Sequence, residues 1–132
     1  MKSVHSNDAP PAVGPYSQAI EAGEFVFCSG QIGLDAKGTL VAGGVEAETK
    51  QVLKNLAAVL AAAGCDFTSV VSVNIYLKNM NDFALVNKLY GKAFANEAKP
   101  ARVTVGVAAL PKDALVEISC VAHSSTSAGA RT

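Results

Sequence analysis

The sequence has no net charge, no long hydrophobic run and no tryptophan, and the first two absences each exclude a class of protein. Its 11 basic and 11 acidic residues cancel, so we do not expect it to bind nucleic acid or a membrane surface through bulk electrostatic attraction. The longest apolar run covers only residues 56–63, whereas a bilayer span requires roughly 20 residues. Half of the 132 residues are hydrophobic, which predicts one folded domain and excludes a disordered chain.

Cysteine, histidine and glycine do not occur in the spacings of the common cofactor sites. The three cysteines and two histidines form neither a CxxC pair nor a zinc-site pattern. Gly30 and Gly33 belong to no phosphate-binding loop, because no Lys-Ser/Thr pair follows them. We therefore expect no metal and no cofactor. The odd cysteine count, and the lack of a hydrophobic targeting segment in residues 1–15, predict a cytoplasmic protein.

The periodicity of the hydrophobic residues predicts strands and two helices within a single domain over residues 1–123. Five strands, with a further short one near Leu40, are predicted at residues 17–22, 25–29, 70–77, 101–107 and 115–122. A long helix is predicted over residues 46–63, ended by Gly64. Asn81 is the predicted N-cap of a second helix, whose apolar stripe is Phe83, Val86, Tyr90 and Phe94. Residues 1–15 are predicted to be an irregular arm and residues 124–132 a flexible tail.

This order, β-β-(β)-α-β-α-β-β, predicts an α+β fold in which a mixed sheet carries both helices on one face. The alternation predicts that the helices cover Val71, Val73, Ile75, Val103, Val105, Val107, Val116, Ile118 and Cys120. The opposite face is then too apolar to be left in water, since it carries Tyr76, Thr104, Leu115, Ser119 and Val121. We expect this face to close against other copies of the chain. A monomer with a half-polar, solvated face is the alternative.

Arg102 and Glu117 stand out because each is a charged residue inside an apolar strand. Arg102 is the only arginine before position 131, and its planar guanidinium can bind a carboxylate through two parallel hydrogen bonds, which a lysine cannot do. If the two strands pair as a hairpin, Arg102, Thr104, Glu117 and Ser119 point to the same side of the sheet. The two charges then either pair with each other or belong to a site.

Other candidate residues carry less information. Ser29 lies outside a G-x-S-x-G frame and is not expected to be a nucleophile. Tyr16 is either a core aromatic or a source of a pocket hydroxyl, and Gly30 would let a backbone N–H approach a ligand. Asn87, on the polar side of the second helix, is predicted at the surface or an interface and is counted with the substrate-binding residues.

Several separated segments carry a family resemblance: Gly14-Pro15-Tyr16-Ser17-Gln18-Ala19, Ser29-Gly30-Gln31-Ile32-Gly33, Asn81-Asp82-Phe83 with Val86, Asn87 and Tyr90, Pro100-Ala101-Arg102-Val103-Thr104-Val105, Ala109-Leu110-Pro111 and Val116-Glu117-Ile118. In order and spacing, over roughly residues 5–122, they resemble the RidA family, also called the YjgF/YER057c/UK114 family. The resemblance implies a fold like that of chorismate mutase from bacilli. It also implies a homotrimer with pockets at the subunit interfaces.

The resemblance further implies an activity, the hydrolysis of reactive enamines and imines such as 2-aminoacrylate, 2-iminopropionate and 2-iminobutanoate to 2-keto acids and ammonia. The carboxylate-binding arginine of the family corresponds to Arg102, its acidic site residue to Glu117, its site tyrosine to Tyr16 and its pocket glycine to Gly30. Arg102 and the backbone N–H of Thr104 would then hold the substrate carboxylate. Glu117 would deprotonate the attacking water and return the proton to the departing ammonia.

The sequence departs from the family pattern at one site position and leaves two other functions open. Many family members have a cysteine where this chain has Thr104, so a thiol has no role there, although the backbone N–H remains. Cleavage of RNA or inhibition of translation is also known in the family, but the neutral net charge argues against it. The other possibility is a non-catalytic trimer that binds a metabolite or acts as a chaperone.

Overall fold

The computed structural model describes residues 1–124, which form six strands, two α-helices and three short 3-10 helices. The strands are β1 (Lys2–Val4), β2 (Ala19–Ala22), β3 (Phe25–Gln31), β4 (Val70–Leu77), β5 (Ala101–Gly106) and β6 (Val116–His123). The helices are α1 (Gly44–Ala62) and α2 (Phe83–Ala93), with the 3-10 helices η1 (Phe67–Ser69), η2 (Met80–Asp82) and η3 (Pro111–Asp113). Of the predicted tail, Ser124 donates its backbone N–H to the carbonyl of Glu24 at 2.7 Å, and residues 125–132 lie outside the described residues.

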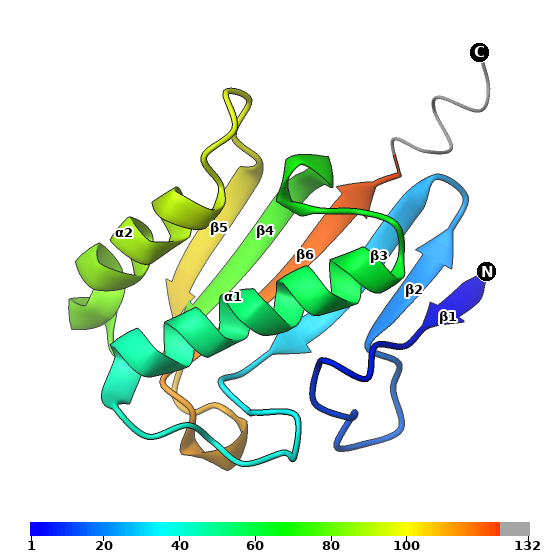
Figure 1. Ribbon diagram of the computed structural model, residues 1–132. Coiled ribbons are helices and arrows are strands. Elements are labelled where there is room, and N and C mark those ends of the chain that lie inside the picture. Colours follow the sequence, from blue (N-terminus) through cyan, green and yellow to red (C-terminus); the bar gives the residue numbers. More distant parts are fainter. Residues whose placement is uncertain (125–132) are drawn as a thin grey trace.

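All six strands belong to one sheet in the order β1-β2-β3-β6-β4-β5. Neighbouring strands are antiparallel except β4 and β5, which run parallel. Both helices lie on the same face of the sheet (Figure 1). The predicted α+β fold, a mixed sheet with two helices on one face, is therefore confirmed.

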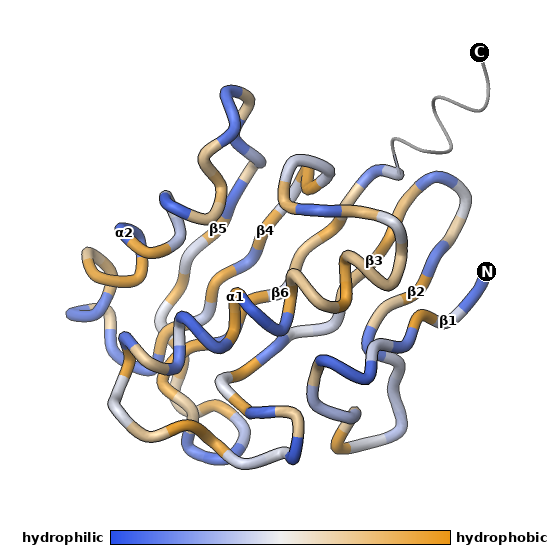
Figure 2. Tube along the Cα trace, in the orientation of Figure 1, coloured by the Kyte–Doolittle hydropathy of each residue, from blue (hydrophilic) through white to orange (hydrophobic). Residues whose placement is uncertain are grey.

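The core lies between the two helices and the sheet. Hydrophobic and hydrophilic residues alternate along the turns of both helices (Figure 2), which gives each helix one apolar side to bury. The most deeply buried side chains come from both layers and include Val52, Leu56, Val59, Leu60, Val73, Ile75, Phe94, Val116 and Ile118. Gly64 follows α1 with a φ of 75°, a left-handed conformation that lets the chain leave the helix as predicted. No helix within residues 1–124 has the length and apolar character needed to cross a bilayer.

Two local predictions are wrong. The arm over residues 1–15 is not wholly irregular, because Lys2–Val4 forms β1 and pairs with β2. Three residues are too few to show a strand alternation in the sequence. Asn79, and not Asn81, provides the cap before the second helix, since its Oδ1 accepts the backbone N–H of Asn81 at 2.9 Å. The cap belongs to η2, a short turn that precedes α2.

The last two strands do not pair as a hairpin, the condition under which Arg102 and Glu117 would share a side of the sheet, and this changes the face that carries Arg102. In the described sheet β4 separates β5 from β6. Arg102 lies opposite the buried Val73, so its side chain points to the helical face, and Thr104 follows on that face. Val103 and Val105, which the alternation predicts to face the helices, are 56% and 40% exposed on the other face.

A β-bulge explains one further difference. Val71 is predicted to face the helices but is 44% exposed, whereas Val70 is buried. The pairing of β4 with β6 shifts register between Val70 and Ser72. Because a bulge adds one residue to a strand, the alternation of buried and exposed residues before the bulge is out of step with the alternation after it.

Asn55 of α1 fixes the segment that follows β3, and this segment forms part of a cavity described below. The Asn55 side chain is fully buried. Its Nδ2 donates to the carbonyl oxygens of Ile32 at 3.2 Å and Leu34 at 2.9 Å, and its Oδ1 accepts from Gln51 Nε2 at 2.8 Å. Asn55 therefore supplies the hydrogen bonds that this irregular, buried backbone cannot obtain from a strand.

We expect Asn55→Leu, which roughly preserves side-chain volume, to lower the free energy of unfolding by about 2–4 kcal/mol, because two buried carbonyl groups lose the side-chain donor that Asn55 gives them. Urea denaturation followed by circular dichroism measures this change. Gln51→Leu is the control, since it removes only the hydrogen bond on the partly buried side of Asn55. The prediction is contradicted if Asn55→Leu lowers the free energy of unfolding by no more than Gln51→Leu does.

Candidate active site

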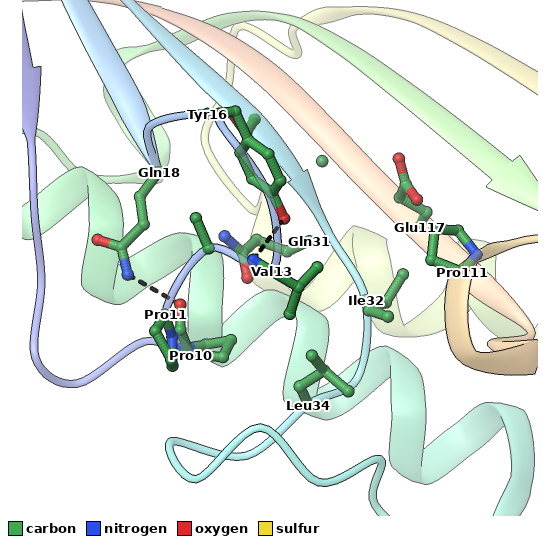
Figure 3. Close-up of a pocket in the computed structure, with 13 residues that line it drawn as sticks. Pro10, Pro11, Val13, Tyr16, Gln18, Gln31, Ile32, Leu34, Pro111 and Glu117 are labelled. Atoms are coloured by element: carbon green, nitrogen blue, oxygen red, sulfur yellow. Dashed lines mark hydrogen bonds between the residues drawn. The ribbon is translucent and has the colours of Figure 1, made fainter.

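A cavity of about 350 Å³ gathers three of the predicted site residues, Tyr16, Gly30 and Glu117. Tyr16 and Glu117 lie on opposite sides of it (Figure 3). Most of the remaining lining is apolar and includes Pro10, Pro11, Val13, Ile32, Leu34 and Pro111. The cavity thus presents one carboxyl group and one phenol within mainly apolar walls.

The backbone of Gly30 packs directly against the Glu117 carboxyl group. A Cβ at position 30 would lie 2.2 Å from Glu117 Oε2 and 2.8 Å from its carboxyl carbon, so a side chain here would displace the carboxyl group. Burial raises the pKa of Glu117, because its partly desolvated surroundings disfavour the charged form. A carboxyl group with a raised pKa beside a cavity is suited to accept and return a proton.

Tyr16 lies on the segment between β1 and β2, and Gln18 holds this segment in place. The Tyr16 side chain is 49% exposed, so it is not a core aromatic, and its hydroxyl oxygen accepts the backbone N–H of Val13 at 3.3 Å. Gln18 is buried. Its Oε1 accepts the N–H of Ser6 at 2.6 Å, and its Nε2 donates to the carbonyls of Pro10 at 2.9 Å and Ser6 at 3.2 Å. The sequence predicts no role for Gln18, although this residue belongs to the first family segment, residues 14–19, and to the strand predicted over residues 17–22.

Arg102 and Asn87 lie at a second cavity, of about 270 Å³, which Tyr90 also lines. The guanidinium carbon of Arg102 lies 4.8 Å from the centre of the Tyr90 ring and 5.8 Å from that of Phe83. Within residues 1–124 the guanidinium forms no ion pair and no hydrogen bond. Its N–H groups are therefore all available to a ligand.

Arg102 and Glu117 point to opposite faces of the sheet. Arg102 shares the helical face with the buried Val73. Glu117 lies between the buried Val116 and Ile118 of β6 and so points to the open face. An ion pair between the two charges of one chain, which the sequence left open, is therefore excluded. A single chain forms one cavity with Tyr16, Gly30 and Glu117 and another with Asn87 and Arg102.

The hydroxyl groups of Thr104 and Ser29 have different surroundings. Thr104 lies on the face of Arg102, and its buried hydroxyl oxygen has no hydrogen-bond partner among the described residues. Ser29 donates its hydroxyl to the carbonyl of Ser17 at 2.6 Å and its backbone N–H to the carbonyl of Gln18 at 2.9 Å. Ser29 therefore links β3 to the segment before β2. Across residues 1–124, no three His, Cys, Asp or Glu side chains are grouped so that they could hold a metal ion.

The open face of the sheet carries five exposed, large apolar side chains. Each is at least 40% exposed, and they are Phe25, Phe27, Val71, Val103 and Val105. They come from β3, β4 and β5, so they extend across the sheet. An apolar surface of this kind is typical of a face that is buried by another chain.

The mixed six-stranded sheet with two helices on one face matches the fold of RidA-type α+β proteins. The family model described as Endoribonuclease L-PSP matches residues 6–124, and the chain belongs to this family, which confirms the resemblance drawn from the sequence motifs. It is 50% identical over 125 residues to a RutC family protein of Pyrococcus horikoshii, covering 93% of this chain and 98% of that protein.

Two further comparisons agree with this assignment. The chain is 48% identical over 122 residues to the 2-iminobutanoate/2-iminopropanoate deaminase of Mus musculus, covering 92% of this chain and 90% of the mouse protein. The crystal structure of RidA from the Antarctic bacterium Psychrobacter sp. PAMC 21119 matches with a TM-score of 0.89 at 38% identity. That match covers 93% of this chain and 99% of the other.

We expect Gly30→Ala to lower the melting temperature by roughly 2–6 °C, because the new Cβ must displace the Glu117 carboxyl group. The same substitution in a Glu117→Ala background should cost much less, since the overlapping atoms are gone. Gly14→Ala is the control, because its Cβ would meet only Tyr16 at 3.4 Å, an ordinary contact. Differential scanning calorimetry of the four variants measures these effects, and equal losses in both backgrounds would contradict the proposed contact.

Proposed function

We propose that the protein hydrolyses 2-imino acids to 2-keto acids and ammonia at a site formed by two protomers. The observation that carries the proposal is the division of the predicted site: Arg102, free of any ion pair within residues 1–124, lies on one face, and Glu117 lies on the other. A substrate that needs both groups must then receive them from different protomers. Relatives about half identical to this chain are named 2-iminobutanoate/2-iminopropanoate deaminase, which supports this reaction.

The two charged groups suit the two ends of a 2-imino acid. The free N–H groups of Arg102 bind the substrate carboxylate and so orient the adjacent C=N carbon. A carboxylate at Glu117 accepts a proton from water as the water oxygen bonds to that carbon. The proton then passes to the nitrogen of the tetrahedral adduct. The hydroxyl group of the adduct gives its own proton to the nitrogen, by way of Glu117, as the C=O bond forms and the C–N bond breaks, so that ammonia and the 2-keto acid leave. Tyr16, across the cavity from Glu117, orients the water or the amine.

The same division supports an oligomer, which the family resemblance makes a homotrimer, in which each site lies between neighbouring protomers. β5, which carries Arg102, is an edge strand of the described sheet, and the open apolar face begins on this strand with Val103 and Val105. Burial of that face against a second copy brings the edge strand of one protomer close to the open face of another, where Glu117 points. The three cysteines are free thiols, which supports a location in the reducing cytoplasm.

Ribonuclease activity is the second candidate, because the matching family model is described as Endoribonuclease L-PSP. The cavity around Glu117 has no basic residue among its lining, and the net charge is zero, so little attracts a polyphosphate to it. RNA cleavage that survives Arg102→Ala and falls steeply with salt would favour this candidate. Binding of a 2-keto acid without any effect on imine hydrolysis would instead favour a non-catalytic carboxylate-binding protein.

We expect Arg102→Ala and Glu117→Gln each to reduce imine hydrolysis by roughly 10²–10⁴-fold when assayed alone. An amino-acid oxidase generates the imine, and release of the 2-keto acid is timed above the uncatalysed rate. Glu117→Gln should retain binding of pyruvate, because Arg102 remains, whereas Arg102→Ala should lose it.

Mixing the two inactive variants tests whether the site is shared. When they are unfolded and refolded together in equal amounts, about a quarter of the sites combine an intact Arg102 with an intact Glu117, so about a quarter of the wild-type rate should return. Refolding each variant alone is the control. If activity does not return although the variants form mixed oligomers, both groups belong to one protomer and the shared site is wrong.

The raised pKa of Glu117 predicts the pH dependence of the reaction. Only the ionised carboxylate can accept a proton from water, so kcat/KM should fall as the pH drops through the pKa of Glu117. Because burial raises that pKa, the fall should occur at a higher pH than an exposed glutamate would give. The measurement is kcat/KM against pH with the uncatalysed rate subtracted. If kcat/KM of Glu117→Gln falls by the same factor and at the same pH, a group other than Glu117 titrates.

A further inference from the structure

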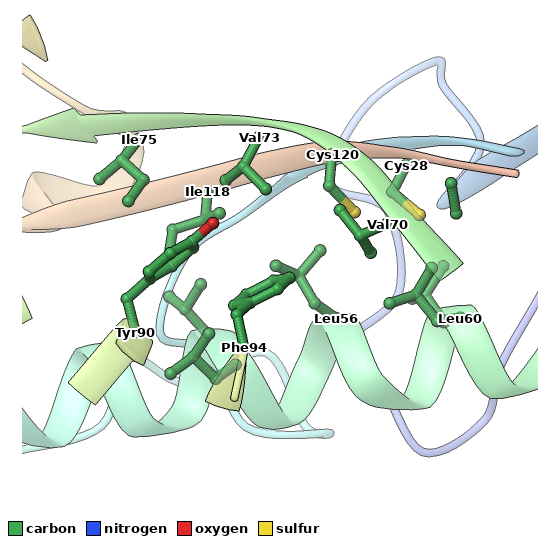
Figure 4. Close-up of a cluster of buried hydrophobic side chains, with 14 of the residues drawn as sticks. Cys28, Leu56, Leu60, Val70, Val73, Ile75, Tyr90, Phe94, Ile118 and Cys120 are labelled. Carbon is green, nitrogen blue, oxygen red and sulfur yellow. The ribbon is translucent and has the colours of Figure 1, made fainter. Parts of the chain in front are cut away.

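A column of aromatic rings runs from Arg102 into the core. The Arg102 guanidinium lies 4.8 Å from the Tyr90 ring centre. Tyr90 stacks on Phe94 with the ring centres 4.4 Å apart and the planes at 22°, and Phe94 contacts Phe67 at 4.6 Å. Figure 4 shows the Tyr90 and Phe94 rings between the helices and the strands. The arginine therefore packs on an aromatic ring, and no acidic side chain of residues 1–124 is paired with it.

We propose that Tyr90 is a positioning residue that holds the Arg102 guanidinium, through the face of its ring, in the orientation that receives the substrate carboxylate. This inference rests on the proposed function for the identity of the ligand. The ring acts on the substrate only through Arg102, so Tyr90 is not itself a catalytic residue.

The need for such a support follows from the other contacts of Arg102. No acid within residues 1–124 is paired with it, and its guanidinium forms no hydrogen bond there. An arginine side chain has several rotatable bonds, and fixing them on ligand binding costs free energy. A cation over an aromatic ring is attracted by the electrons of the ring. This attraction limits the motion of the guanidinium while its N–H groups stay free to bind two carboxylate oxygens.

The Tyr90 ring, and not its hydroxyl group, carries this role. The side chain is 7% exposed, and its hydroxyl oxygen has no hydrogen-bond partner within residues 1–124. The hydroxyl points toward the sheet (Figure 4), and burial raises its pKa. Since a phenylalanine would present the same ring face, Tyr90→Phe should keep the function of Arg102.

Phe83 and Phe67 provide matched comparisons. Phe83 lies farther from the guanidinium, at 5.8 Å, and is 38% exposed, so its contribution should be smaller. Phe67 belongs to the same column but packs against Phe94 with the ring planes tilted by 51°, two rings away from Arg102. Phe67→Leu therefore removes a ring from the column and leaves the contact with Arg102 in place.

The experiment measures pyruvate binding by isothermal titration calorimetry and imine hydrolysis by the coupled assay. Tyr90→Leu should weaken pyruvate binding by about 5- to 30-fold, as the loss of a partly desolvated cation–π contact predicts. KM should rise correspondingly while kcat stays within about twofold, because Glu117 is unchanged. Tyr90→Phe and Phe67→Leu should bind pyruvate like the wild type, and Phe83→Leu should show an intermediate loss.

A second measurement does not depend on the enzymatic activity. Phenylglyoxal modifies arginine, and the chain has only Arg102 and Arg131, so Arg131 serves as an internal reference in peptide mass spectrometry. Removing the ring exposes the guanidinium, and the modification of Arg102 relative to Arg131 should be faster in Tyr90→Leu than in Tyr90→Phe or Phe67→Leu.

The two measurements separate failure of this inference from failure of the proposed function. If the wild type neither hydrolyses imines nor binds pyruvate, but Tyr90→Leu alone changes the modification of Arg102, the proposed function fails and the positioning role stands. If modification and binding are the same in Tyr90→Leu and Phe67→Leu, Tyr90 is only a core aromatic. A loss of binding in Tyr90→Phe would show that the hydroxyl group is needed and would overturn the role given to the ring.

Discussion

The parallel pairing of β4 with β5 is the constraint on which the arrangement of the site depends. Two parallel strands cannot be joined by a tight turn, so the chain crosses over through α2 between them. The crossover lays α2 over the helical face, and the register places Arg102 opposite Val73 beneath that helix. One pairing therefore sets the face of the arginine, brings Tyr90 and Phe83 against it, and separates it from Glu117.

The opposite face follows from the same register. Once Arg102 and Thr104 point to the helices, the alternate residues Val103 and Val105 must point away from them, where no element of residues 1–124 covers them. The edge strand thus combines a free cation on one side with exposed valines on the other. In the proposed site, burial of the apolar side would drive association, and the cation on the other side would supply half of a site that association completes.

Most of the fold could be predicted from the sequence because its long elements have strong periodicity. The helix ending at Gly64 and the strand over Val70–Leu77 were correctly placed from local patterns alone. The faces of β5 could not be predicted, because alternation shows that Arg102 and Val103 point apart but not which of them meets the helices. That choice depends on the neighbouring strand, which is set by contacts distant in the sequence. The bulge before Ser72 could not be predicted either, because it is a feature of the pairing of β4 with β6, which is distant in the sequence.

The family motifs accounted for one cavity of the candidate site, but not for the surroundings of Arg102. Family motifs selected Tyr16, Gly30 and Glu117, and the structure brings these three to one cavity. Tyr90 was assigned only to the apolar stripe of its helix, because nothing in a helical periodicity distinguishes a ring that packs in the core from a ring that also faces a guanidinium. The distinction lies in the position of β5 relative to α2, which is again a consequence of the parallel pairing.

The contact between Arg102 and the Tyr90 ring affects how the guanidinium can bind a carboxylate. A carboxylate partner within the chain would fix the guanidinium, but it would occupy the same N–H edges that a substrate carboxylate needs, and binding would first have to break that pair. An aromatic ring contacts the flat face of the guanidinium and leaves its edges free. In the proposed imine hydrolysis, one preorganised arginine would orient the substrate and one carboxyl group would transfer the proton. Neutral, aromatic support for a cation is therefore the arrangement that allows tight orientation without competition from within the protein.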